Sequence, residues 1–388
     1  MLHRQLGSFI VTRYGDESVR AYLPPPLPPN PPLELDRIQT QLEEANLALG
    51  RMDGISFLLP DPALVLYGYI RREAVMSSQI EGTQSSLSDL LMYEHSDAPG
   101  VPELDVLEVS NYVAAMNHGL RRMREGFPIS SRLICEIHGV LLGKGRGSDK
   151  LPGEFRRSQN WIGGTRPGNA LYVPPPPDQI AGCMTALERI IHEKRPGLPP
   201  LVKVALVHVQ FESIHPFLDG NGRLGRLLIT LMLAAENVLR DPLLYLSLYL
   251  RRNRTTYYDL LTRVRQTGDW ETWLEFFLTG VRDSAQEATI MARQIWQLHV
   301  RDQQKVDQLG RPGRSALQVY AYLQRQPVLT IPNTAKALSL SAPTVAKAVE
   351  NLERLGIAKE VTGRQRDRIY RYEAYVRMLN EGTEVARA

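Results

Sequence analysis

Hydrophobic residues recur at every third or fourth position along most of the chain. The pattern is clear from Leu35 to Leu49, where apolar residues stand at positions 35, 38, 42, 45 and 49. This spacing places them on one face of an α-helix, as a helix packed against a core requires. The same pattern predicts further helices over residues 64–75, 104–123, 130–142, 180–192, 201–213, 224–237, 253–265, 270–279 and 285–309.

Strand-like patterns are sparse before residue 355. The best candidate is 160–174, where two short aromatic and β-branched segments flank a Gly/Pro turn. We therefore expect an all-α core with one projecting β-hairpin. Seven prolines occupy positions 23–32, and they predict an extended, stiff arm over the domain surface, because proline lacks the amide hydrogen that regular structure needs.

The C-terminal segment, 311–388, carries 13 Lys/Arg and 7 Asp/Glu, a net charge of +6. Helical patterns over 314–324, 331–338 and 342–355 are followed by two strand-like segments, which predicts a winged helix-turn-helix domain. Arginines at 364, 366 and 368 suit contact with phosphates, and Thr344, Lys347 and Asn351 are expected to face outward. Acidic residues on the same third helix leave DNA binding and protein contact or dimerisation both open.

We divide the chain into four parts. An N-terminal region with the proline-rich arm covers 1–100, a catalytic core covers 101–285, a linker helix covers 286–310, and the winged helix covers 311–388.

Composition narrows the class of protein. The 388 residues are 43% hydrophobic and 23% charged, with a net charge of +4 and two cysteines, Cys135 and Cys183, outside any CxxC or Cys/His cluster. These values are typical of a folded chain in a reducing compartment, without disulfides or structural zinc. No apolar run approaches the ~20 residues that cross a bilayer, and the N-terminus lacks the features of a signal peptide. We expect a cytoplasmic protein with no membrane contact.

One segment, 215–226, combines chemically capable residues at short spacing: His-Pro-Phe-Leu-Asp-Gly-Asn-Gly-Arg-Leu-Gly-Arg. Glycines at a loop that opens a helix let backbone amides approach an anion. Arg223 and Arg226 are three residues apart, so both project from one face of the first turn and suit a chain of phosphates. Asp219 offers a hard oxygen for Mg²⁺. His215 is a candidate general base.

This segment resembles the signature of the Fic family, HxFx(D/E)GNGRxxR, and matches every defined position. The segment 152–156 resembles the family's PGxFR, and 160–174 stands where the family has a hairpin called the flap. The resemblance covers about residues 35–285. It implies a Fic-type helical core and transfer of AMP from ATP to a hydroxyl of a protein target and of the enzyme itself.

The resemblance also implies roles for individual residues. His215 would deprotonate a Ser, Thr or Tyr of the target, and Asp219 would position Mg²⁺. The expected nucleotide contacts are Asn160, Trp161, Ile162 and Gly163 of the flap, Asp219, Gly220, Asn221, Gly222, Arg223, Leu224, Gly225 and Arg226 of the loop and helix start, and Tyr257 and Tyr258 at the adenine. The target would add to the flap as an extra strand, and a homodimer stays open.

An upstream segment, 77–82, reads Ser-Ser-Gln-Ile-Glu-Gly and matches the Fic inhibitory motif (S/T)xxxE(G/N) at Ser77, Glu81 and Gly82. A carboxylate held against Arg226 would occupy the guanidinium meant for the γ-phosphate. Taken alone, the pattern fits an ordinary helix N-cap as well. The same glutamate could instead activate water to remove AMP from a modified target, and the sequence leaves the dominant direction open.

Two further interpretations remain. Relatives with altered motifs transfer phosphate or phosphocholine, but the phosphate-transferring branch departs from GNGR, which is intact here at 220–223. The alternative from another class is a nucleotide-sensing, DNA-binding transcriptional regulator, supported by the basic residues of the wing. Label transfer from α-labelled rather than γ-labelled ATP separates AMP transfer, the altered transfer reactions and the regulator.

Overall fold

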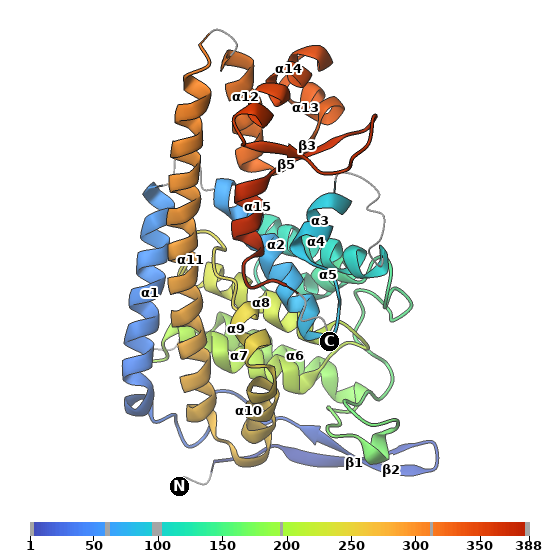
Figure 1. Cartoon of the computed structure of the whole chain (residues 1–388). Helices are drawn as coiled ribbons and strands as arrows, with labels where there is room; N and C mark the ends of the chain where they lie inside the picture. Colours follow the sequence, from blue (N-terminus) through green and yellow to red (C-terminus); the bar gives the residue numbers. More distant parts are fainter. Residues whose placement is uncertain (1–3, 59–62, 95–102, 195–196, 311–312, 385–388) are drawn as a thin grey trace.

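The computed structural model describes residues 4–58, 63–94, 103–194, 197–310 and 313–384. Helices dominate, so the expectation of a helical fold is confirmed (Figure 1). The helices are η1 (Leu35–Ile38), α1 (Gln39–Leu58), α2 (Ala63–Ile80), α3 (Leu87–Tyr93), α4 (Glu103–Arg124), α5 (Ser131–Leu141), η2 (Pro167–Asn169), α6 (Pro177–His192), α7 (Pro200–Ile214), α8 (Asn221–Ala235), α9 (Ser247–Arg252), α10 (Arg254–Thr267), α11 (Trp270–Asp307), α12 (Gly313–Arg325), α13 (Ile331–Leu338), α14 (Ala342–Arg354) and α15 (Glu373–Asn380). The strands are β1 (Ser8–Tyr14), β2 (Glu17–Leu23), β3 (Val328–Thr330), β4 (Ala358–Glu360) and β5 (Ile369–Tyr372).

Helix α7 is the centre of the core, because every residue from Leu201 to Ile214 is buried. It is tied to α11 by Trp273, which donates its indole N–H to the carbonyl oxygen of Ala205 at 3.1 Å. Helix α8 packs beside α7, and α2 and α4 contact α8. The C-terminal end of α7 and the N-terminal end of α8 therefore meet inside the molecule, where the loop that joins them is held by surrounding helices.

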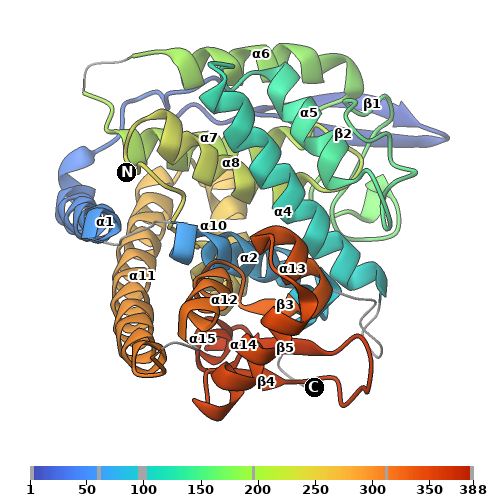
Figure 2. The same ribbon diagram turned by 90° about the horizontal axis from the view of Figure 1, so that it is seen from above.

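The long helix α11 replaces two helices that the sequence pattern separated. It runs for 38 residues beside α1 and extends from the core to the C-terminal domain (Figures 1 and 2). Buried small residues such as Gly280 and Ser284 continue the helix through the weakly periodic stretch. The expected boundary between 285 and 286 falls inside this helix. The boundary at 100/101 lies outside the described residues, and the one at 310/311 lies where a described range ends.

The sequence pattern missed the N-terminal hairpin. Strands β1 and β2 pair antiparallel, with Ser8 opposite Leu23 and Tyr14 opposite Glu17. Strand β1 is largely exposed, so it lacks the alternation that marks a half-buried strand; β2 buries Val19, Ala21 and Tyr22, but over too short a stretch to stand out.

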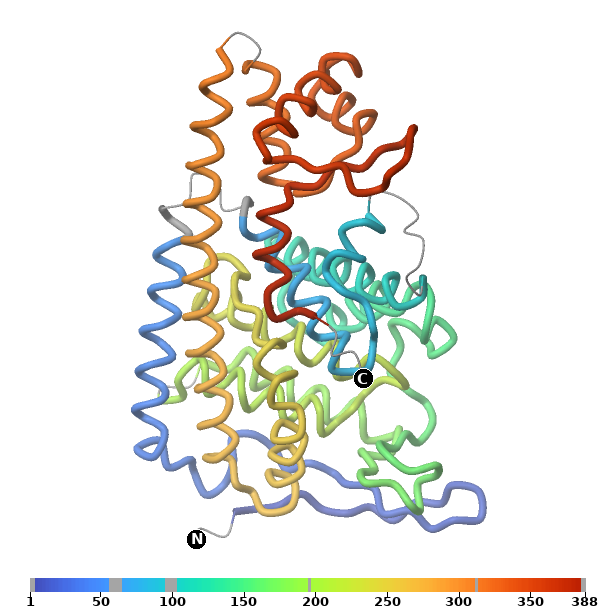
Figure 3. The backbone as a smooth tube through the Cα atoms, in the orientation of Figure 1, coloured from blue at the N-terminus to red at the C-terminus, as the bar shows by residue number. Residues whose placement is uncertain are grey.

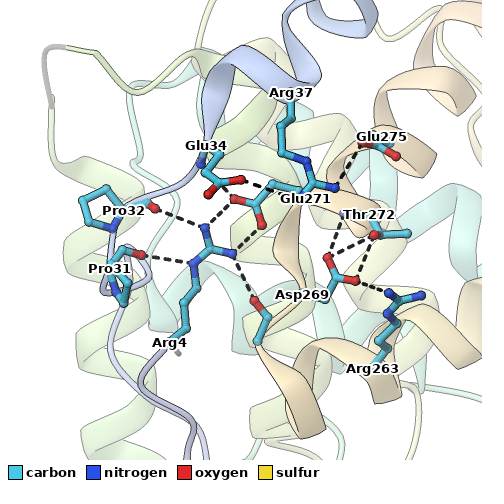
Figure 4. A network of polar contacts seen from close by, with 11 residues as sticks. Arg4, Pro31, Pro32, Glu34, Arg37, Arg263, Asp269, Glu271, Thr272 and Glu275 are labelled. Carbon is cyan, nitrogen blue, oxygen red and sulfur yellow. Dashed lines mark hydrogen bonds and ion pairs between the residues drawn. The ribbon is translucent and has the colours of Figure 1, made fainter. Parts of the chain in front are cut away.

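The proline-rich arm that follows lies on the domain surface. Arg4 donates to the carbonyl oxygens of Pro31 and Pro32 at 3.1 Å and pairs with the buried carboxylate of Glu271 at the start of α11 (Figure 4). These contacts fasten the arm to the helical core.

The flap is less regular than expected. Only one bridge pair, Ile162 with Tyr172, joins its two arms within the described residues, because Gly163 and Gly164 both take positive φ and interrupt the strand. One arm is also covered: the amide of Tyr22 in β2 donates to the carbonyl oxygen of Val173 at 2.9 Å. The prediction of a freely exposed two-stranded ribbon is therefore wrong for this arm.

The C-terminal domain is a winged helix-turn-helix, as expected. Helices α12 to α14 pack together, and an antiparallel sheet has the strand order β3-β5-β4. Two elements were not predicted, the short strand β3 and the helix α15. The expectation that Asn351 faces outward is wrong, since this side chain is 2% exposed. Of the other two, Lys347 is exposed and Thr344 is half-buried.

Helix α15 carries the chain back to the core, where it lies beside α2 and α3 (Figure 3). Arg72 of α2 donates to the carbonyl oxygens of Leu379 at 3.0 Å and Glu381 at 2.6 Å. Gln79, two turns further along α2, donates to the carbonyl oxygen of Thr383 at 3.2 Å. The C-terminal tail is thus bound to the same helix that carries Ser77.

None of the helices described is both long and apolar enough to cross a lipid bilayer.

Candidate active site

The loop between α7 and α8 places the histidine and the aspartate. His215 ends α7 in the left-handed region, with φ 49°, and Gly220, with φ 76°, begins α8. Asn221 closes the loop: its Oδ1 accepts from the amide of Phe217 at 2.9 Å and its Nδ2 donates to the carbonyl oxygen of Phe217 at 2.8 Å. The Asn221 side chain is therefore committed to the loop, and only its backbone amide stays available to a nucleotide.

Two buried arginines stand in the first turns of α8. Arg223 and Arg226 are 3% and 2% exposed. Nε of Arg223 and Nη1 of Arg226 complete no hydrogen bond with any described residue, while Nη1 of Arg223 lies 3.0 Å from Oε1 of Glu108 in an ion pair. Buried donors without acceptors are costly in a finished structure, so these N–H groups are well suited to donate to an anionic ligand such as a phosphate chain.

The segment 77–82 binds the guanidinium of Arg226 through Ser77 and Glu81. Ser77 receives two hydrogen bonds from Arg226, one at Oγ at 2.9 Å and one at its carbonyl oxygen at 3.0 Å. Glu81 Oε1 accepts from Nη2 at 2.7 Å. Gly222 makes room for this carboxylate, since a Cβ there would lie 2.3 Å from Oε1. Burial alone would raise the pKa of Glu81, but the charge and hydrogen bond of Arg226 outweigh burial and lower it, so Glu81 is ionised.

His215 is held in place by a polar contact from the segment that precedes the flap. Arg156, the arginine of PGxFR, donates through Nε to the carbonyl oxygen of His215 at 2.9 Å. Burial, with the nearby charges of Arg156 and Arg265, lowers the pKa of His215 to about 3. The imidazole is therefore neutral at physiological pH, which is the form that can take up a proton.

Asp219 is the residue that fits a magnesium ion. Its Oδ1 accepts from the amide of Gly220 at 2.6 Å, and its side chain is 39% exposed. Gly147 leaves space beside the second oxygen, because a Cβ there would lie 2.8 Å from Oδ2. The described residues hold no group of three metal-binding side chains. A single open carboxylate agrees with Mg²⁺, which takes one or two carboxylates plus substrate phosphates.

The four flap residues that were expected to contact a nucleotide each make a different contact within the protein. Asn160 braces the loop through Nδ2, which donates to the carbonyl oxygens of residues 217 and 218 at 3.3 and 3.2 Å. Trp161 packs edge-on against Tyr14 of the N-terminal hairpin, with ring centroids 5.6 Å apart. Ile162 forms the flap bridge, and Gly163 supplies the turn. The Trp161 ring therefore serves packing, and the backbone of the segment is what remains to line a nucleotide.

The expected adenine pair divides into one core residue and one surface residue. Tyr257 is 1% exposed, and its hydroxyl lies 2.9 Å from Nε2 of His208. Tyr258 is 38% exposed, with the Arg254 guanidinium 5.6 Å from its ring centroid. Only Tyr258 can offer its ring to a ligand, so the interpretation of Tyr257 as a direct contact is wrong for its side chain.

Two further residues of the loop motif pack inward. Leu224 is 1% exposed and belongs to the hydrophobic core. Gly225 lets α8 approach α7, since a Cβ there would lie 2.4 Å from Oε1 of Glu212. Side-chain contact of Leu224 with a nucleotide is therefore excluded in this arrangement, and Gly225 has a packing role.

The structure adds residues that sequence reasoning missed. Oε1 of Glu108, on α4, lies 3.0 Å from Nη1 of Arg223. Arg146, in the 142–150 loop, approaches the other oxygen of the Glu108 carboxylate. Glu212, three residues before His215, is buried beside Arg226, and burial raises its pKa to about 7. Single acidic residues on predicted helices carry no spacing signal, so only the fold could bring them to the site.

These groups surround a cavity of about 190 Å³, lined by Glu81, Glu108, Arg146, His215, Asp219, Gly220, Asn221, Gly222 and Arg223. Pockets for whole ligands usually measure about 300–1,000 Å³. The smaller volume agrees with the position of the Glu81 carboxylate beside Arg226, inside the space that a triphosphate would need.

Comparison with known families finds three matches. Residues 39–121 match the Fic/DOC family N-terminal domain, residues 128–233 match the Fic/DOC family, and residues 314–359 match a winged helix-turn-helix DNA-binding domain. The Fic match includes the flap and the first turns of α8, and the N-terminal match includes the segment 77–82.

Curated relatives named "Protein adenylyltransferase Fic" share part of the chain. The protein of Drosophila ananassae is 30% identical over 171 residues, which is 44% of this chain and 31% of that protein. The protein of Aedes aegypti is 34% identical over 150 residues, 38% of this chain and 27% of that protein. The chain thus spans less than a third of the length of these relatives.

Solved structures share the fold. A Fic family protein from Desulfovibrio desulfuricans superposes with a TM-score of 0.57 at 22% identity and covers 90% of this chain and 98% of its own. Fic-1 from C. elegans superposes with a TM-score of 0.50 at 21% identity, over 66% of this chain and 74% of its own. The chain therefore contains a Fic N-terminal domain and a Fic domain, followed by a winged helix-turn-helix domain.

Proposed function

We propose that the protein is an adenylyltransferase that transfers AMP from ATP to a Ser, Thr or Tyr hydroxyl of a target protein and of itself, and that Glu81 restrains it. The observation that carries the proposal is the first part of α8: Arg223 and Arg226 are buried there with unused donors, in the same site as the neutral His215. The name of the curated relatives supports the same reaction.

The reaction balances with the residues present. The target hydroxyl loses its proton to His215, and its oxygen bonds to the α-phosphorus of ATP. The bond between the α-phosphorus and the bridging oxygen breaks, and pyrophosphate leaves. Arg223 and Arg226 neutralise the phosphate charge, which is the main demand of such transfers. Asp219 would hold Mg²⁺, which when bound supplies further charge neutralisation on the phosphates.

Inhibition follows from competition for one guanidinium. Glu81 and the γ-phosphate would both bind Nη2 of Arg226, from which Oε1 of Glu81 now accepts a hydrogen bond at 2.7 Å. Because Ser77 keeps its two bonds to Arg226, the arginine stays in place when Glu81 leaves. ATP therefore enters a prepared site once the carboxylate moves. With Glu81 in place, the same carboxylate could instead activate water and remove AMP from a modified target.

Transfer from labelled ATP tests the reaction. Purified Glu81→Gly protein should become labelled by α-labelled ATP with Mg²⁺ and stay unlabelled by γ-labelled ATP. Labelling from γ-labelled ATP alone would indicate phosphate transfer instead, and no labelling from either would remove the transferase from consideration. Release of AMP from a labelled target by the wild-type chain would establish the reverse direction.

A second candidate function rests on the winged helix. Arg364, Arg366 and Arg368 are exposed at the tip of the wing, as expected for phosphate contact. Lys347 of α14, however, pairs with Glu350 at 2.8 Å, which reduces the positive charge of the recognition helix. A nucleotide-sensing DNA-binding regulator would show an ATP-dependent mobility shift that weakens with salt; a protein-docking or dimerising winged helix would show none.

A further inference from the structure

Arg223 has an acidic partner that lies outside the family motif. Glu108, on α4, places Oε1 3.0 Å from Nη1 of Arg223, and each side chain is only 4% exposed. Asp219 lies further away, with Oδ1 3.6 Å from Nη2. The closest charge to the first arginine of the phosphate site is therefore a carboxylate contributed by another helix.

Neighbouring groups fix Glu108 in this position. Thr83 donates through Oγ1 to Oε1 of Glu108 at 2.9 Å, and Nη1 of Arg146 lies 3.9 Å from Oε2. One turn earlier on α4, Asp105 accepts from the amide of Gln84 at 2.8 Å. Glu108 thus belongs to a network that joins α4 to the residues following the inhibitory motif.

Glu81 and Glu108 differ in their freedom to move. The Glu81 side chain is 36% exposed, and Gly82 follows it with φ +100°, so a small backbone change can withdraw it. Glu108 is buried within a helix and held on more than one side. A nucleotide can therefore displace Glu81 from Arg226, whereas Glu108 stays paired with Arg223 throughout.

We propose that Glu108 is a positioning residue that orients Arg223 toward the triphosphate of ATP, and that Thr83 makes this orientation depend on the inhibitory segment. The proposal rests on the proposed nucleotide site. Nη1 of Arg223 faces Glu108, whereas Nε completes no hydrogen bond with a described residue, so the fixed guanidinium retains a donor for a phosphate oxygen. Without its buried counter-charge the guanidinium would lose its preferred orientation.

One stretch of chain then acts on both arginines. Ser77 and Glu81 bind Arg226 directly, and Thr83 reaches Arg223 through Glu108. A movement of residues 77–84 would change both contacts together. The segment would therefore adjust two phosphate-binding groups at once, beyond the single contact that the inhibitory motif implies.

The test measures ATP affinity and turnover separately in the Glu81→Gly chain. Titration calorimetry with ATP and Mg²⁺ should show that Glu108→Gln weakens binding about tenfold, whereas kcat for self-labelling changes less than about threefold. The matched control is Glu236→Gln, which removes another partly buried partner, 2.6 Å from Lys203 and outside the site, and should leave ATP affinity unchanged. Thr83→Val should weaken binding in the same direction by a smaller factor.

Unchanged or tighter ATP binding by Glu108→Gln would overturn the proposal, because a carboxylate that merely competes with phosphate would improve binding when neutralised. If Glu108→Gln does not fold by circular dichroism, Thr83→Val decides, and an unchanged affinity in that variant overturns the proposal. ATP binding that depends on Glu108 without any AMP transfer would leave the positioning role intact and reject the proposed reaction.

Discussion

The sharpest prediction concerns the bond between Glu81 and Arg226. In Glu81→Gly, Arg226 loses the hydrogen bond at 2.7 Å to Nη2 but keeps both bonds to Ser77. A hydrogen bond between charged groups contributes about 1.5–3 kcal/mol. Since about 1.4 kcal/mol equals a factor of ten, productive ATP binding and self-labelling at low ATP should rise roughly 10- to 150-fold.

The assay follows incorporation of α-labelled ATP into the purified chain at several ATP concentrations. Glu81→Gln separates charge from shape, because the amide keeps an oxygen toward Nη2 but loses the negative charge; it should give an intermediate rate. Glu94→Gln is the matched control, since Glu94 forms a comparable pair with Arg71 at 2.9 Å away from the site, and it should label like wild type. A Glu81→Gly rate within twofold of wild type would refute the reasoning.

Three further predictions follow from the same contacts. His215→Ala should abolish labelling while ATP affinity, measured by calorimetry in the Glu81→Gly chain, changes less than threefold; labelling at the Glu81→Gly rate would contradict the proposed base. Burial lowers the pKa of His208 to about 3 and of His299 to about 4, so their contribution to stability is complete above pH ~6.5 and is lost as pH falls toward 4, with a slope of up to about 1.4 kcal/mol per pH unit for each. Denaturant melts from pH 8 to 4 check this, and a free energy of unfolding that rises on acidification would contradict it. Deleting 381–388 removes carbonyl acceptors of α2 and should raise self-labelling above wild type but below Glu81→Gly; unchanged labelling of the folded deletion would show that the tail does not hold the inhibitory helix.

Local sequence predicted the parts of the site that lie close together in the chain. The spacing of His215, Asp219, Arg223 and Arg226 depends on one loop and one helix turn, so the pattern alone was enough to infer a phosphate site beside an imidazole. The same holds for the helices with strong periodicity. Glu108 could not be found in this way, because its contact with Arg223 joins helices more than a hundred residues apart.

Errors arose where two neighbouring residues have different surroundings. Adjacent residues of a helix point about 100° apart, so Tyr257 and Tyr258 could not both face one ligand. One enters the core beside His208, and the other reaches the surface. Likewise the weak periodicity near residue 282 suggested a break in a helix that tertiary packing against α1 keeps continuous.

In the proposed mechanism, two glutamates have opposite roles because they differ in burial and in the number of their partners. Glu81 stands at the end of a helix before a glycine, partly exposed, and pairs with Arg226, the guanidinium that the proposed mechanism assigns to the γ-phosphate. Glu108 lies inside a helix, buried, and holds a guanidinium in place. Since the cost of moving a charged group depends on how many partners it must leave, the first can act as a reversible restraint and the second cannot. Neutralising Glu81 should therefore increase ATP use, and neutralising Glu108 should decrease it.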